Sequence, residues 1–155
     1  MTFITNNIST SGFTGSTLFV ENYIDMAIDV NPKPSYEEGR VFYDYSEHTL
    51  SVYNSSSAVT HQIGQEGLVR VYNNSGALIN DGKVVKITGS EGVENRPTIA
   101  LAQGNNRQNA NVIGITTESI SNNSFGYVTD WGIVNDLNTI GFVEGGLVYL
   151  STTVA

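Results

Sequence analysis

The chain has 155 residues, of which 15 are acidic and only 7 are basic, so its formal net charge is −8. Its polar character comes instead from 17 Asn, 15 Ser and 15 Thr residues. The scattered basic residues exclude the clustered Lys and Arg surface that nucleic-acid binding needs. No apolar run approaches the roughly 20 residues of a membrane-spanning helix, and the lack of cysteine excludes disulfides and thiolate metal sites.

Residues 1–35 are predicted to form an extended docking arm that contains one long strand. Residues 1–17 are mostly small and polar, with too few bulky apolar groups to form a core. Over residues 18–30 apolar side chains alternate with polar ones, and this period of two predicts a half-buried strand, although Ile24 and Ile28 also fit a helical spacing. Prolines at positions 32 and 34 should end the element.

The arm carries the predicted partner interface, because its apolar residues have no evident partner within the chain. The predicted interface residues are Phe3, Ile8, Phe13, Leu18, Val20, Ile24, Met26, Ile28 and Val30.

The rest of the chain is a series of short β-type runs separated by turns rich in Asn, Ser and Gly, which predicts an all-β fold. Residues 36–66 are expected to form a β-hairpin region, and residues 67–155 a small β-barrel or β-sandwich. The predicted strands of the hairpin lie at 41–45 and 49–53. The later runs lie at 68–72, 83–88, 97–102, 112–116, 125–129, 131–134 and 146–151.

No motif in the sequence points to catalysis, and we expect no enzyme, cofactor or metal site. His48 and His61 are best explained as turn or edge residues, and no G-x-S-x-G elbow occurs. Three carboxylate pairs are candidates for acid–base chemistry; opposite strand faces explain the first more simply and solvation the second. These pairs are Glu37 with Glu38, Asp25 with Asp29, and Asp130 with Asp136.

Several segments in order along the chain carry a resemblance to a known group of proteins. They lie at 38–44, 47–54, 63–66, 69–76, 81–85, 113–117, 126–128, 132–134 and 145–151. Across roughly residues 36–151 the chain resembles a small β module found in virion proteins of tailed bacteriophages. The resemblance implies a module of tail-fibre, baseplate and capsid-decoration proteins that is usually homotrimeric and has no catalytic residues.

These observations lead to the hypothesis of a non-enzymatic phage structural protein, located in the virion and assembled in the host cytoplasm. The partners would be the major capsid protein or tail proteins. Longer fibre relatives continue beyond the strand corresponding to 146–151, whereas this chain stops at Ala155, which favours a capsid decoration (cement) protein or the base of a head fibre. The alternatives are a tail adaptor or fibre-attachment module and, third, a carbohydrate-binding protein that uses Trp131.

Overall fold

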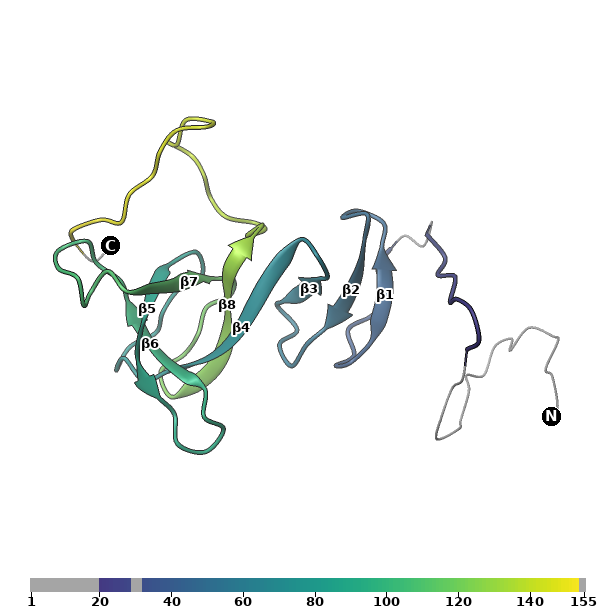
Figure 1. The fold of residues 1–155 in the computed structure, drawn as a ribbon, viewed down its shortest axis with the longest axis horizontal. Coiled ribbons are helices and arrows are strands. Elements are labelled where there is room, and N and C mark those ends of the chain that lie inside the picture. Colours follow the sequence, from purple (N-terminus) through teal and green to yellow (C-terminus); the bar gives the residue numbers. More distant parts are fainter. Residues whose placement is uncertain (1–19, 29–31, 154–155) are drawn as a thin grey trace.

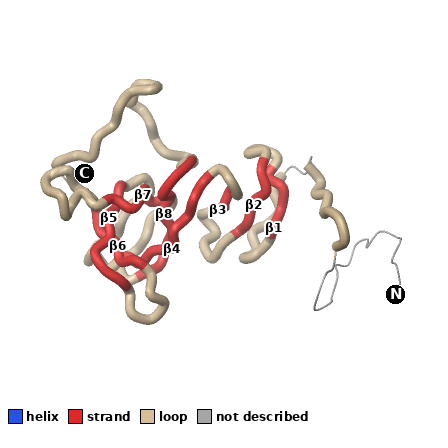
Figure 2. Tube along the Cα trace, in the orientation of Figure 1, coloured by secondary structure: helices blue, strands red, loops and turns tan. Residues whose placement is uncertain are grey.

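A computed structural model describes residues 20–28 and 32–153 of the chain. This part of the chain contains eight strands and no helix (Figure 2). The strands form two units that follow one another along the chain, a small open sheet and then a closed barrel (Figure 1). The predicted all-β fold is therefore confirmed, and of the two predicted architectures the larger unit adopts the barrel.

The open sheet has three antiparallel strands in sequence order. They are β1 (Val41–Asp44), β2 (Thr49–Tyr53) and β3 (Thr60–Gln62). The hairpin between β1 and β2 matches the predicted one. Its turn is stabilised by Asp44, whose Oδ1 accepts hydrogen bonds from the backbone N–H and the hydroxyl of Ser46 at 3.1 and 2.7 Å. Such local capping by a short acidic side chain is typical of turns.

The barrel closes in the strand order β4-β6-β5-β7-β8. Its strands are β4 (Glu66–Asn73), β5 (Val84–Ser90), β6 (Pro97–Leu101), β7 (Val112–Thr116) and β8 (Ser124–Gly132). The β4–β6 pair is parallel and the other pairs are antiparallel, with β4 and β8 paired along their whole lengths. Each strand thus has a neighbour on both sides, although the β4–β6 and β7–β8 pairs are short.

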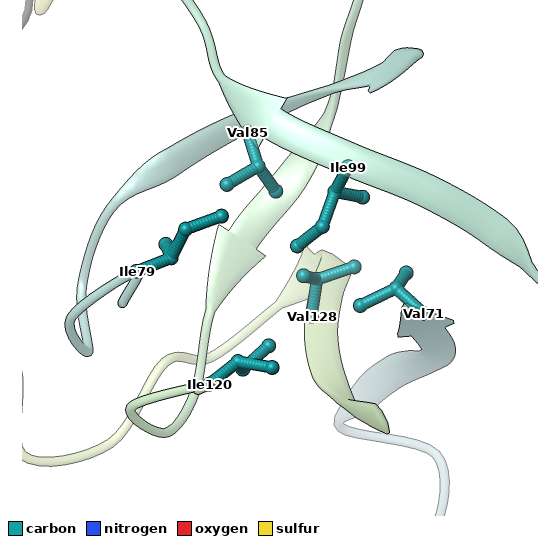
Figure 3. Packing of buried hydrophobic residues seen from close by; sticks show 6 residues of the cluster. All are labelled: Val71, Ile79, Val85, Ile99, Ile120 and Val128. Atoms are coloured by element: carbon teal, nitrogen blue, oxygen red, sulfur yellow. The ribbon is translucent and has the colours of Figure 1, made fainter. Parts of the chain in front are cut away.

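The core of the barrel consists of six β-branched residues whose side chains meet in its interior (Figure 3). Four come from the strands β4, β5, β6 and β8, and the other two, Ile79 and Ile120, come from loops that pair with each other. The six residues are Val71, Ile79, Val85, Ile99, Ile120 and Val128, each at most 1% exposed. Their β-branched side chains suit the pleated surface of a strand.

A buried asparagine fixes the end of the barrel where these two loops meet. Asn73 is fully buried, and its Nδ2 donates hydrogen bonds of 2.8 Å to the carbonyls of Ala77 and Ile120, while its Oδ1 accepts from the backbone N–H of Ser75. These contacts satisfy backbone groups that the strand ladders do not reach.

Two predicted strands are not found. Residues 20–28 form no strand, so the strand predicted over 18–30 is absent from its described part, and residues 146–151 also run without strand pairing. Apolar alternation predicted the strand over 18–30 and a short apolar run predicted the one over 146–151, but a strand also needs a neighbour to satisfy its backbone. In the described residues no strand pairs with residues 20–28 or with residues 146–151.

Candidate functional site

The described part of the predicted interface is exposed. Val20, Ile24 and Ile28 are between 40% and 63% exposed, and Met26 is half-buried. The other predicted interface residues lie outside the described residues; they are Phe3, Ile8, Phe13, Leu18 and Val30. Together with Tyr23, which is 75% exposed, the chain thus leaves four large hydrophobic side chains in contact with solvent over residues 20–28.

The chain that follows this segment is fastened to the open sheet. The Nζ of Lys33 pairs with Oδ2 of Asp44 at 2.8 Å, the hydroxyl of Tyr53 donates to the carbonyl of Pro34 at 2.6 Å, and the hydroxyl of Tyr36 donates to the carbonyl of Asn54 at 2.9 Å. Residues 33–36 are therefore bound to the open sheet.

Asp44 is the centre of this attachment, and its side chain is fully buried. Burial opposes the charged form of the carboxylate, but the ion pair with Lys33 and the hydrogen bonds from Ser46 outweigh it and lower the pKa of Asp44 below its usual value. The carboxylate is therefore ionised at neutral pH and attracts the Lys33 ammonium. An aromatic cluster packs beside it, in which the Tyr53 ring centroid lies 4.7 Å from that of Phe42 and 5.5 Å from that of Tyr36.

A second exposed apolar segment follows the barrel. We call residues 137–151 the C-terminal arch, because the chain leaves the end of β8, stands away from the barrel and then returns to it (Figure 1). Six large apolar side chains of the arch are between 65% and 91% exposed. They are Ile140, Phe142, Val143, Leu147, Val148 and Tyr149.

Both ends of the arch contact the barrel. At one end a methyl group of Leu137 lies over Gly82, 2.6 Å from where a β-carbon on that glycine would stand. At the other end the N–H of Gly104 donates to the carbonyl of Ser151 at 2.7 Å. The arch is therefore held at both ends while its middle part remains exposed.

A polar cleft of about 520 Å³ lies where the open sheet meets the barrel. Its lining is rich in carboxylates and contains one lysine. The ionisable residues among the lining are Lys33, Glu47, Glu66, Asp81, Glu118 and Asp136. Within the described ranges no three His, Asp or Glu side chains are grouped so that they could hold a metal ion.

Two of these carboxylates are engaged in joining the sheet to the barrel. Glu118 accepts hydrogen bonds from the hydroxyl of Ser56, at 2.6 Å, and from the backbone N–H of Tyr127, at 3.1 Å. Glu66, only 6% exposed, accepts from the backbone N–H of Gln62 at 2.9 Å. Burial raises the pKa of Glu66 despite that hydrogen bond. We therefore interpret the cleft as a structural joint.

The histidines and carboxylates that were candidates for catalysis occupy several different elements in the described part of the chain. His48 occupies the β1–β2 turn with a φ of 51°, and Nε2 of His61 lies 3.3 Å from the carbonyl oxygen of Glu66. Asp136 lines the cleft, whereas its proposed partner Asp130 is exposed on β8. Glu37 forms an ion pair with Arg40. The exposed Asp25 belongs to the N-terminal segment, and its partner Asp29 lies outside the described residues.

Trp131, the residue of the carbohydrate-binding alternative, is 56% exposed near the end of β8, and its indole lies across Gly67. In the part of the chain that the structure describes, no other aromatic ring packs against it. A single ring of this kind offers one stacking face and no enclosed sugar site.

No family model, curated protein or solved structure matches this chain. Over the described ranges, no helix is long and apolar enough to cross a bilayer.

Sequence reasoning missed the contacts that hold the candidate surfaces in place. No local sequence pattern predicts these contacts, which are the Lys33–Asp44 ion pair and the packing of Leu137 on Gly82. Each joins residues that are not neighbours in the sequence. The sequence indicates the exposure of the arch only weakly. The two glycines before Leu147, Val148 and Tyr149 interrupt any longer strand.

Proposed function

We propose that this protein is a non-enzymatic structural subunit of a tailed-phage virion, a capsid decoration protein or head-fibre base that docks through its N-terminal residues 1–35. The observation that carries the docking proposal is the exposed apolar segment 20–28 above a fixed attachment. Val20, Ile24 and Ile28 contact solvent, while residues 33–36 are bound to the open sheet.

The physical argument is one of unpartnered apolar surface. Burying one large aliphatic side chain contributes roughly 1.5–3 kcal/mol relative to leaving it in water. Because Val20, Ile24 and Ile28 are 40%, 62% and 63% exposed, a partner that covers all three gains less than about twice that amount, before the cost of ordering the segment.

The assignment to a phage particle is supported by the sequence resemblance alone, and the homotrimer expected from it belongs to the same proposal. The tail-adaptor alternative uses the same docking segment and differs only in the partner. The carbohydrate-binding alternative is supported by the exposure of Trp131 alone.

The test compares binding of the full chain and of two variants to purified virions of the phage that encodes it. Replacing Val20, Ile24 and Ile28 together by Ser should reduce binding at least tenfold, because the apolar contact is lost. Val93→Ser is the matched control, since Val93 is 89% exposed and lies in the barrel. Undiminished binding of the triple variant would rule out docking through this segment, and gold-labelled antibody would show whether the bound protein lies on the head or the tail.

A further inference from the structure

The C-terminal arch presents more apolar surface than a free surface segment normally carries. Its six large apolar side chains are between 65% and 91% exposed. If each of the six side chains had the roughly 200 Å² of an aromatic one, the arch would expose on the order of 900 Å²; four of the six are smaller aliphatic side chains, so the exposed area lies below that bound and near the roughly 800 Å² that each partner contributes to a standard protein interface. The area is thus sufficient for a specific interface.

The arch is also partly organised before it meets a partner. Besides its two contacts with the barrel, it contains two tight turns, closed by hydrogen bonds from Phe142 N–H to the carbonyl of Thr139 at 3.0 Å and from Gly146 N–H to the carbonyl of Val143 at 2.9 Å. Gly141 and Gly145 supply the positive φ angles of 96° and 69° in these turns. A surface that is already shaped loses less conformational entropy on binding.

The charge distribution indicates which partner the arch fits. The chain carries a net charge of −8, so two copies repel each other over most of their surfaces. The arch contains a single charged residue, Glu144, and is therefore a region where two copies can meet with little like-charge repulsion. Symmetric association also brings the same patch of each copy together, which suits a patch with six large apolar side chains and one charged residue.

We propose that the C-terminal arch is a self-association surface, through which copies of this chain pack their apolar arch residues against one another. The inference deepens the proposed function, since it names the surface that joins copies, but its test needs no virion. A monomer that still binds virions would overturn this inference alone. An oligomer that does not bind them would overturn only the docking proposal.

The experiment measures the mass of the full chain in solution by size-exclusion chromatography with light scattering, over a range of micromolar concentrations. We expect an integral multiple of 16.7 kDa. The double variant Val143→Asp with Leu147→Asp should fall to one 16.7 kDa unit, because buried like charges oppose the contact. Val93→Asp, an equally exposed valine outside the arch, should leave the mass unchanged. A monomeric parent chain, or a double variant with the parent mass, would overturn the proposal.

Cross-linking gives a second measurement that does not depend on a disruptive substitution. The chain contains no cysteine, so Leu147→Cys places a single thiol on the arch and Val93→Cys places one elsewhere. Under mild oxidation Leu147→Cys should form a disulfide-linked dimer at least tenfold faster than Val93→Cys. Equal rates would show that the arches do not meet.

Discussion

The barrel and the two segments that flank the folded units differ in the exposure of their apolar side chains. In the barrel, β-branched residues such as Val71 and Ile99 are fully buried. In the N-terminal segment and the C-terminal arch, Ile24 and Ile140 are 62% and 91% exposed. Runs rich in apolar residues are present in both kinds of region, so apolar character alone does not decide whether a residue is buried within its own chain.

The difference lies in whether another strand is available. Each barrel strand has a strand neighbour on both sides. Apart from contacts such as that of Leu137 with Gly82, the large apolar residues of the flanking segments are left exposed. We infer that the chain divides its apolar surface between folding, which the barrel completes alone, and association, which the segment 20–28 and the arch are proposed to serve.

The largest effect on the free energy of unfolding is expected when the same Ile→Ala substitution is compared at a core position and at an exposed position. Ile99→Ala should lower the free energy of unfolding by about 3 kcal/mol, because it leaves a cavity in a core where Ile99 is fully buried. Ile24→Ala, in the exposed segment, should change it by less than about 0.5 kcal/mol. Urea titrations followed by far-UV circular dichroism measure both. Similar losses in the two variants would show that the segment is part of the folded core.

A smaller effect is expected at the boundary between the exposed segment and the sheet. Lys33→Gln should destabilise the open sheet by about 2 kcal/mol, because the buried Asp44 carboxylate loses its cation. The folded-state pKa of Asp44 lies below its usual value of 3.8. The carboxylate therefore contributes stability above pH 3.8, and this contribution is lost as the pH falls through the folded-state pKa.

The stability difference between the parent chain and Lys33→Gln should accordingly be full at neutral pH and disappear below the folded-state pKa of Asp44. Urea titrations followed by the near-UV signal of the Tyr36–Tyr53 cluster report on this sheet. Lys83→Gln makes the same change beside β5 and serves as the control. A pH-independent difference would contradict the ion pair as its cause.

The sequence predicted the strands that carry apolar alternation and failed where tertiary pairing decides the outcome. Val69 and Val71 in β4 and Val128 in β8 lie in runs that were predicted as strands. Strand β3 was missed because its three residues, Thr60, His61 and Gln62, are all polar and show no alternation. The run at 146–151 was predicted as a strand from composition, and no local feature indicates that no strand of the described residues pairs with it.

The candidate surfaces, like the strands, could be predicted from the sequence only in part. Val20, Ile24 and Ile28 were predicted at an interface from their apolar character, and their exposure is compatible with that prediction. The attachment of the segment through Lys33 and Asp44 depends on a contact between distant residues, which a single sequence does not encode as a local pattern.

The smallest expected effect lies at the joint between the sheet and the barrel, where Glu66 is buried beside Gln62. Burial raises the folded-state pKa of Glu66 above its usual value of 4.5. The protonated side chain therefore contributes to the stability of the folded parent chain below pH 4.5, and this contribution is lost as the pH rises through the folded-state pKa. Glu66→Gln removes the charge and keeps an oxygen for the Gln62 N–H. The variant should therefore be more stable than the parent chain at neutral pH, by less than about 1 kcal/mol, and equally stable in acid.

Glu38→Gln is the control for this prediction, because Glu38 is exposed and the same substitution there should have no pH-dependent effect on the free energy of unfolding. If Glu66→Gln instead destabilises the chain at neutral pH, the Glu66 carboxylate makes a charged contact that the joint requires. The sheet and the barrel would then be held together by that charge as well as by the hydrogen bonds of Glu118 with Ser56 and Tyr127. If the expected gain is found, burial of the Glu66 charge is a cost of joining the two units, and the remaining contacts of the joint suffice to hold them.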